Sequence, residues 1–389
     1  TGMNVAAGYD YKLSWQIIMA ALMLILIFVL ERQMVNIRPQ VRRSKIMVRA
    51  TALAYILIIA STVYGTDVLA DHGFKPDFWN QSRGYHNSGI WYNFCLNTKY
   101  LHVSEPEGYS ADDISALADE VIAAVDPDPD NDTSINMLTG EDTYKPTGET
   151  PNVIAIMNET FSDPGTLGDL QTNMDYLPFY HSLSENTIKG TLSVPVFGAG
   201  TSNSEYEFLT GNSISTLPSG SSVYESYIDS AQPSLVSTLE SQGYSSRAFH
   251  PYFADGWNRP SVYNDMGFDD FISMEDIIDP TVVAQYQEDN DEDAFIEKVE
   301  ALYPEEDNML LRRFVSDSYD YEKLEEMYEQ RDPSQPFFAF NVTMQNHGGY
   351  DDEDYPTTVQ VEQAPGEYPQ TEQYLSLTKK SDQALEYLI

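Results

Sequence analysis

The chain of 389 residues carries 61 acidic and 21 basic side chains, which gives a formal net charge of −40. This acidic excess argues against a nucleic-acid-binding protein, because phosphate recognition requires clustered Lys and Arg. Hydrophobic residues make up 42% of the chain, which is enough for a buried core and argues against wholesale disorder. A single cysteine, Cys95, excludes an intrachain disulfide and a cysteine-built zinc site.

Two apolar runs near the N-terminus predict two transmembrane helices. Residues 13–30 contain no charge and would span about 27 Å as a helix, close to one hydrocarbon core. Residues 50–65 form a second, shorter run. A buried core helix could mimic either run alone, and a cleaved signal peptide could mimic the first. Neither alternative explains two runs that flank a basic loop, which holds Arg32, Arg38, Arg42, Arg43, Lys45 and Arg49.

The basic loop also predicts the orientation of the chain. Short loops rich in Lys and Arg face the cytoplasm, so the loop within residues 1–65 is expected inside and everything after Thr66 outside. The chain begins Thr1-Gly2-Met3 and ends within a helical pattern at residues 374–389. We therefore expect a fragment of a longer multi-pass protein of the cell membrane, truncated at both ends.

Residues 66–150 are expected to connect the membrane to a globular part. Residues 66–109 are rich in aromatic side chains, as is typical of a membrane interface. Ser110 is the predicted N-cap of an amphipathic helix that ends before Asp126. The following residues up to 150 are mainly Pro, Asp, Thr and Gly, which predicts a linker.

From residue 151 onward, short apolar runs alternate with helical patterns. This alternation predicts an α/β sandwich with a mostly parallel sheet. Strands are expected at residues 152–157, 190–197, 246–250 and 337–344, and helices near 175–186, 202–210, 233–242 and 321–330. Residues 281–333 are strongly acidic and helical, and we expect them to form a solvated insertion.

Two candidate site residues follow predicted strands, where parallel α/β sheets bind ligands. Glu159 follows the first strand, and a carboxylate there can hold a hard cation, although a surface acid is the simpler interpretation. Thr201 opens a helix, where backbone N–H groups favour negative charge. A hydroxyl that touches a cation there becomes a nucleophile. The alternative is a simple helix cap, since Ser202 and Glu205 form a capping-box pattern.

Three further candidates follow the later strands. Trp257 and Arg259 combine an aromatic ring with a guanidinium, which suits a phosphate attached to a polar alcohol, unless Arg259 forms an ordinary ion pair. His347 could donate to a phosphate or act as an acid or base, unless it is structural. Because all these candidates lie at carboxyl ends of predicted strands, together they indicate one pocket for an anion and a metal.

At these residues the chain resembles the lipoteichoic acid synthase and phosphoglycerol transferase family, a sulfatase-like branch of the alkaline phosphatase superfamily. The resemblance covers about residues 151–389 and implies the N-terminal part of a sulfatase-like catalytic domain. The motifs that carry it are residues 152–163, the segment Gly200-Thr201-x-x-x-Glu205-x-Glu207-Phe208-Leu209-Thr210-Gly211-Asn212, Trp257-Asn258-Arg259 and Asn346-His347.

The resemblance implies a role for each candidate residue. Glu159 would be a ligand of a divalent metal, typically manganese, with magnesium as the alternative. Thr201 would be both metal ligand and nucleophile, forming a covalent glycerol-phosphate intermediate. Trp257 and Arg259 would line the glycerol-phosphate site, and His347 would contact the substrate phosphate. The family's Asp-His metal pair is absent after His347, so the second half of the metal site is expected beyond residue 389.

The resemblance also implies the substrates. The donor would be phosphatidylglycerol and the acceptor a polyglycerolphosphate chain on a glycolipid, at the outer face of a Gram-positive-type cell membrane. A phosphoethanolamine transferase and a phosphodiesterase or sulfatase-like hydrolase remain alternatives, as does an inactive membrane-tethered acidic binding module. A formylglycine sulfatase is disfavoured, because the segment that begins at Thr201 lacks the Pro and Arg which that chemistry needs.

Overall fold

The computed structural model describes residues 75–98, 100, 103, 108–124, 150–218 and 220–389, with a few positions between 49 and 61. The chain divides into two compact units, Thr1–Val103 and Ser104–Ile389. The predicted span at residues 13–30, most of the span at 50–65 and nearly all of the linker lie outside the described residues. Within the described part, no helix is long and apolar enough to cross a membrane.

Two of the described helices, α5 (Gln81–Ser88) and α6 (Ile90–Thr98), belong to the first unit. In the second unit, α7 (Ala111–Ala124) confirms the helix predicted after Ser110. The Ser110 hydroxyl accepts a hydrogen bond from the Asp113 backbone N–H at 3.2 Å, as an N-cap does.

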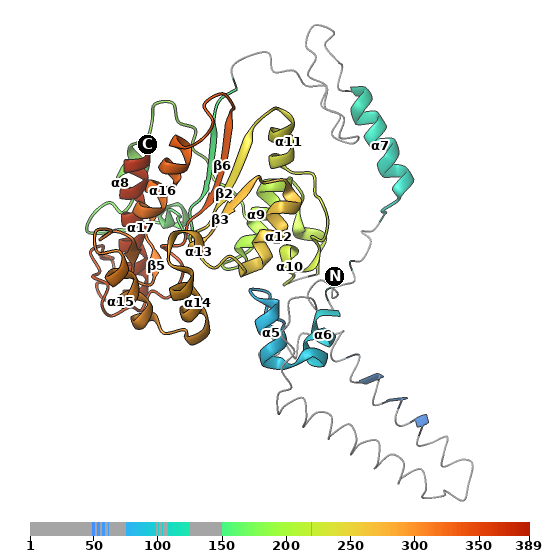
Figure 1. The fold of residues 1–389 in the computed structure, drawn as a ribbon, viewed down its shortest axis with the longest axis horizontal. Helices are drawn as coiled ribbons and strands as arrows, with labels where there is room; N and C mark the ends of the chain where they lie inside the picture. Colours follow the sequence, from blue (N-terminus) through green and yellow to red (C-terminus); the bar gives the residue numbers. More distant parts are fainter. Residues whose placement is uncertain are drawn as a thin grey trace, which may run out of the picture. The chain divides into compact units, whose positions relative to one another are not determined.

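The main sheet has four parallel strands in the order β1-β6-β2-β3 (Figure 1). These are β1 (Val153–Met157), β2 (Ser245–Phe249), β3 (Asp270–Ile272) and β6 (Phe337–Val342). Met157 pairs with Val342, and Phe249 pairs with Asn341, so the carboxyl ends of β1, β6 and β2 lie side by side. The α/β architecture with a parallel sheet is thus confirmed.

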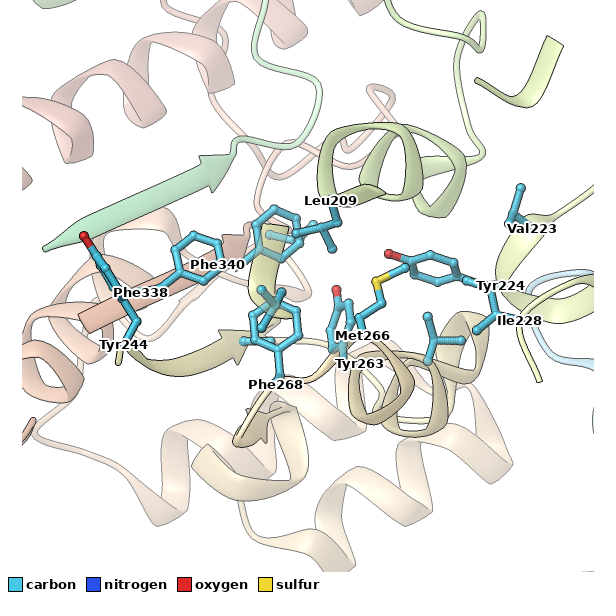
Figure 2. Packing of buried hydrophobic residues seen from close by; sticks show 14 residues of the cluster. Leu209, Val223, Tyr224, Ile228, Tyr244, Tyr263, Met266, Phe268, Phe338 and Phe340 are labelled. Atoms are coloured by element: carbon cyan, nitrogen blue, oxygen red, sulfur yellow. The ribbon is translucent and has the colours of Figure 1, made fainter. Parts of the chain in front are cut away.

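Helices cover both faces of this sheet (Figure 1). Successive β6 side chains point to opposite faces, so each face has apolar side chains on which helices pack. Phe338, Phe340 and Val342 pack on one face against helices α9–α12, as Figure 2 shows for the two Phe rings. Phe337 and Ala339 pack on the other face against α16 and α17. The helices of the first face are α9 (Thr201–Thr210), α10 (Val223–Ser226), α11 (Leu235–Ser241) and α12 (Arg259–Met266).

The remaining helices and strands belong to the same unit. They are α8 (Pro178–Ser182), α13 (Met274–Ile277), α14 (Pro280–Asp289), α15 (Glu292–Leu302), α16 (Asp317–Glu329), α17 (Pro369–Leu388) and the antiparallel pair β4 (Leu310–Leu311) and β5 (Phe314–Val315). Short 3₁₀ turns occur at Pro164–Leu167, Ile214–Thr216 and Gly256–Asn258.

The strand predicted at residues 190–197 is wrong. These residues form no strand, and Leu192 and Phe197 are exposed by 82% and 106%. The alternation of apolar side chains suits a strand, but a strand also needs a neighbour to pair its backbone groups. No described strand pairs with this segment, and Pro195 has no N–H to contribute.

The solvated insertion predicted at residues 281–333 is also wrong. Tyr321 and Leu324 on α16 are fully buried against the sheet. Phe295 on α15 is 2% exposed and stacks on Tyr286 of α14, with ring centroids 4.3 Å apart. Each of these helices carries acidic residues together with an apolar stripe that packs inward. Net charge alone therefore did not indicate that the helices are partly buried.

Candidate functional site

The carboxyl ends of β1 and β6 are joined by polar side chains that hold Glu159. The Glu159 backbone N–H donates to Thr343 Oγ1 at 3.0 Å, and the Thr343 hydroxyl donates to Asn158 Oδ1 at 3.1 Å. The Glu159 carboxylate is half-buried and accepts a hydrogen bond from Thr160 Oγ1 at 2.8 Å. Glu159 is therefore oriented by the strand that follows β1 in the sheet, as expected for a residue at this edge.

His347 lies in the segment that leaves β6, and its ring reaches solvent. On its inner side the ring packs against Phe314, with the centroids 5.6 Å apart. Desolvation on this side lowers the pKa of His347; the carboxylate of Glu159 opposes the shift, and Arg313 and Arg312 reinforce it. The structure thus brings His347 and Glu159 within electrostatic reach and keeps the imidazole mainly neutral near pH 7.

Thr201 is the first residue of α9, after a turn of three left-handed residues. Gly198, Ala199 and Gly200 have φ values of 68°, 54° and 67°. The predicted capping box is wrong, because Gly200 occupies the N-cap position and Ser202 is buried inside the helix. Without a side-chain cap, the first backbone N–H groups of α9 remain available to an anion beside the Thr201 hydroxyl.

Arg259 is buried at the start of α12 and is 1% exposed. Its Nη2 lies 2.5 Å from Glu205 Oε1 on α9, and the Tyr263 hydroxyl donates to Glu205 Oε2 at 2.6 Å. Burial alone would lower the pKa of Arg259, but the Glu205 carboxylate raises it overall. The structure therefore shows the ion pair that the sequence left as an alternative, and contact of Arg259 with a substrate stays a prediction.

Trp257 lies in the turn before α12 and is half-buried against the core behind α9. Trp257 and Asn258 both have left-handed backbones, with φ values of 60° and 55°. Non-glycine residues adopt this conformation rarely, and such strain concentrates at functional sites. The ion pair of Arg259 with Glu205 ties this turn to the helix that begins with Thr201.

The sequence pattern indicated no role for His250. It follows β2 directly, is 2% exposed, and its Nδ1 lies 2.7 Å from the Val342 carbonyl oxygen. Burial, the charge of Arg259 and the neighbouring His347 lower the pKa of His250 well below its usual value. Its position after a strand, like those of the other candidates, was the signal that could have identified it.

The donor atoms of the site fit the expected metal only in part. Glu159 and Thr201 offer oxygen atoms, the donor type that Mg²⁺ and Mn²⁺ prefer. Among the described residues, however, no group of three or more His, Cys, Asp or Glu side chains is arranged to hold a metal ion. These two residues are therefore not a complete ligand set, and no step of the reaction derived below is routed through a metal ion.

Parts of this chain are similar in sequence to known proteins. A putative cyclic beta-1,2-glucan modification protein of Rhizobium meliloti is 30% identical over 81% of this chain and 41% of its own length. A lipoteichoic acid synthase of Staphylococcus saprophyticus is 28% identical over 61% of this chain and 32% of its own. The chain thus spans less than half the length of these relatives.

A solved structure shares the fold. The phosphoglycerol transferase GacH of Streptococcus pyogenes, in complex with sn-glycerol-1-phosphate, superposes with a TM-score of 0.52 at 22% identity, over 74% of this chain and 65% of its own. The family model described as Sulfatase matches residues 151–389, which is more than half of the chain and contains the whole main sheet. The chain belongs to the sulfatase family.

Proposed function

We propose that the protein is a membrane-anchored phosphoglycerol transferase with Thr201 as its nucleophile. The observation that carries this proposal is the position of Thr201 at the uncapped start of α9, behind a left-handed turn. Backbone N–H groups and the helix dipole at this point stabilise negative charge on a phosphoryl group. The relatives named as a lipoteichoic acid synthase and a phosphoglycerol transferase support the reaction class.

The transfer proceeds in two steps. Thr201 Oγ1 forms a bond to the phosphorus of phosphatidylglycerol while the phosphorus–oxygen bond to diacylglycerol breaks. The proton lost by the Thr201 hydroxyl is balanced by the proton that the leaving diacylglycerol oxygen gains. The oxygen of an acceptor hydroxyl then forms a bond to the same phosphorus while the bond to Thr201 Oγ1 breaks, and the proton lost by the acceptor is balanced by the proton that Thr201 Oγ1 regains. His347, mainly neutral, donates a hydrogen bond to a phosphate oxygen, and Trp257 packs against the glycerol group.

Glu159 and Thr201 would supply two oxygen ligands to a divalent metal, manganese or magnesium. When bound, such an ion would polarise the phosphoryl oxygen and favour the alkoxide form of a hydroxyl. The catalytic unit would lie on the outer side of the membrane, since the basic loop at residues 31–49 is expected inside. There it can meet both a lipid donor and a glycan acceptor.

The acceptor has a second candidate. One relative, which is 30% identical over 81% of this chain, is named for modification of cyclic beta-1,2-glucan, so a glucan hydroxyl is an alternative to a polyglycerolphosphate chain. The donor half of the reaction is the same for both acceptors. Diacylglycerol release without any acceptor other than water would instead indicate a phosphodiesterase.

The test uses the full-length protein in detergent micelles that contain labelled phosphatidylglycerol. Thr201→Ala should reduce diacylglycerol release at least about 10⁴-fold, because the nucleophile is removed, and the wild type should form a phosphoglycerol adduct on the peptide that contains Thr201. Thr210→Ala, at the other end of α9, is the matched control and should retain turnover. Undiminished diacylglycerol release by the Thr201→Ala variant would refute the assignment of Thr201 as the nucleophile. No release in the wild type with either acceptor would favour the inert binding module.

A further inference from the structure

Three buried residues behind the site form a closed ring of hydrogen bonds, which we call the α16–α17 clamp: Asp317, Gln345 and Ser381. Asp317 and Ser381 are 0% exposed and Gln345 is 2% exposed. The Asp317 backbone N–H donates to Gln345 Oε1 at 3.0 Å, and Gln345 Nε2 donates to Ser381 Oγ at 3.0 Å. The Ser381 hydroxyl donates to Asp317 Oδ2 and closes the ring.

The clamp joins three segments that are distant in the sequence. Asp317 begins α16, Ser381 lies on α17, and Gln345 lies in the segment that leaves β6, two residues before His347. Asp317 receives no charge partner among the described residues, and its Oδ1 accepts no hydrogen bond there. Burial of a carboxylate without a counter-charge lowers the stability of the folded protein. Apolar side chains at this contact between α16 and α17 would make the protein more stable.

The hydrogen bonds of the clamp continue toward His347. Asn346 is fully buried, and its Nδ2 donates to Ser381 Oγ at 2.7 Å. The Tyr350 hydroxyl donates to the Asn346 carbonyl oxygen at 2.8 Å. Arg312 Nη2 donates to the carbonyl oxygens of Gln345 and His347, at 2.8 and 3.0 Å. Residues 345–347 are thus fixed by directional contacts on the buried side, while the His347 ring is left at the surface.

We propose that Asp317 and Ser381 are positioning residues that fix the direction in which His347 presents its imidazole beside Glu159. Ser381 is the centre of this arrangement, since its one hydroxyl contacts Asp317, Gln345 and Asn346. Loss of that hydroxyl removes the hydrogen bonds from Gln345 Nε2 and Asn346 Nδ2, and leaves the Gln345 side chain held through its Oε1 by the Asp317 backbone N–H. The imidazole then leaves its place against Phe314. The effect on turnover rests on the proposed function, in which His347 contacts the substrate phosphate.

The test compares two buried serines on the same helix in the full-length protein. Ser381→Ala removes the clamp, whereas Ser376→Ala removes a serine that is 2% exposed and binds the Thr358 and Val359 backbone N–H groups instead. Both variants lose buried hydrogen bonds, so general loss of stability should affect them alike. Only Ser381→Ala should alter His347.

Two measurements are made on each variant. The first is the position of the His347 imidazole resonance at one fixed pH, assigned with His347→Gln. It should move in Ser381→Ala and stay in Ser376→Ala. The second is phosphatidylglycerol turnover: kcat should fall about tenfold or more in Ser381→Ala with KM changed less than about threefold, because a misplaced group costs mainly the transition state. If Ser381→Ala does not fold, Ser381→Cys, which keeps a weak donor, should show smaller changes of the same sign.

The outcomes separate this inference from the proposed function. An unmoved His347 resonance in folded Ser381→Ala or Ser381→Cys would overturn the positioning role, whatever the turnover. Equal changes in the Ser381 and Ser376 variants would overturn it too, because they would show a general structural effect. A wild type without turnover but with a selective shift of the His347 resonance would overturn the proposed function and leave the positioning of His347 standing.

Discussion

The ion pair between Glu205 and Arg259 holds two helices of the site together. Both side chains are almost fully buried, at 0% and 1% exposure, and the pair ties α9 to α12. Tyr263 donates a second hydrogen bond to the same carboxylate. Removal of one partner from a buried pair leaves the other charge uncompensated in the interior, which costs far more than the net contribution of the pair.

Glu205→Gln should therefore lower the free energy of unfolding by about 3–5 kcal/mol, because it leaves the Arg259 guanidinium buried without a counter-charge. Urea unfolding followed by circular dichroism measures this change. The control is Glu326→Gln, since Glu326 is 53% exposed in its ion pair with Lys323 and such pairs contribute about 0–1 kcal/mol. Similar losses in both variants would contradict the assigned burial of Glu205.

At the scale of the element, α16 carries two buried carboxylates in its first turn. Asp317 and Asp320 lie three residues apart and are both 0% exposed. Burial raises the pKa of Asp317 to about 6. Burial and the charge of Asp317 raise the pKa of Asp320 well above its usual value. Asp320 accepts a hydrogen bond from Asn341 Nδ2 at 2.8 Å, which attaches α16 to β6.

These raised pKa values make stability fall as the pH rises. Between about pH 4, where an unfolded Asp titrates, and pH 6 the native state binds more protons than the unfolded state, so the free energy of unfolding decreases with pH. Asp320 extends the decrease to higher pH. Asp320→Asn removes its charge, so the variant should lose about 1–3 kcal/mol less than wild type between pH 4 and 8.

Urea unfolding at each pH measures this difference. The matched control is Asp293→Asn, an exposed aspartate in the first turn of α15, and its pH dependence should run parallel to that of the wild type. If Asp320→Asn also runs parallel to the wild type, Asp320 does not have the raised pKa assigned to it.

At the scale of the whole molecule, charge is distributed very unevenly along the chain. Residues 31–49 hold six basic residues and one acidic residue, whereas residues 66–389 hold 14 basic and 59 acidic residues, a net 14 − 59 = −45. A basic loop between two apolar runs predicts a cytoplasmic loop, with the acidic remainder outside. Cys95 is exposed in the described first unit and lies on the outer side in this topology.

A membrane-impermeant maleimide should therefore label Cys95 in intact spheroplasts. Cys95→Ser should abolish the labelling, since the chain has no second cysteine. The same variant with Ser44→Cys, in the basic loop, should be labelled only after the membrane is permeabilised. Labelling of Cys95 that requires permeabilisation would reverse the predicted orientation.

The fold was predictable where one segment carries its own pattern. The strands near residues 152–157, 246–250 and 337–344 and the helix that begins near Thr201 were predicted from local periodicity, and the structure has β1, β2, β6 and α9 there. The short strand β3 was not predicted, because its three residues carry no period. The strand at residues 190–197 failed because pairing depends on a neighbour that its own residues do not specify.

The parallel α/β architecture and the order of the candidate residues were predictable from the chain's own pattern, because hydrophobic period and the position after a strand are local properties. The contacts of those side chains arise only when the chain folds. Folding pairs Arg259 with Glu205, brings His250 within electrostatic reach of His347, and buries Asp317 and Asp320 within an acidic stretch that was expected to be solvated. Each of these contacts joins residues at least 21 positions apart, or depends on which face of a helix turns inward, and the local pattern of one segment does not encode the surface of another.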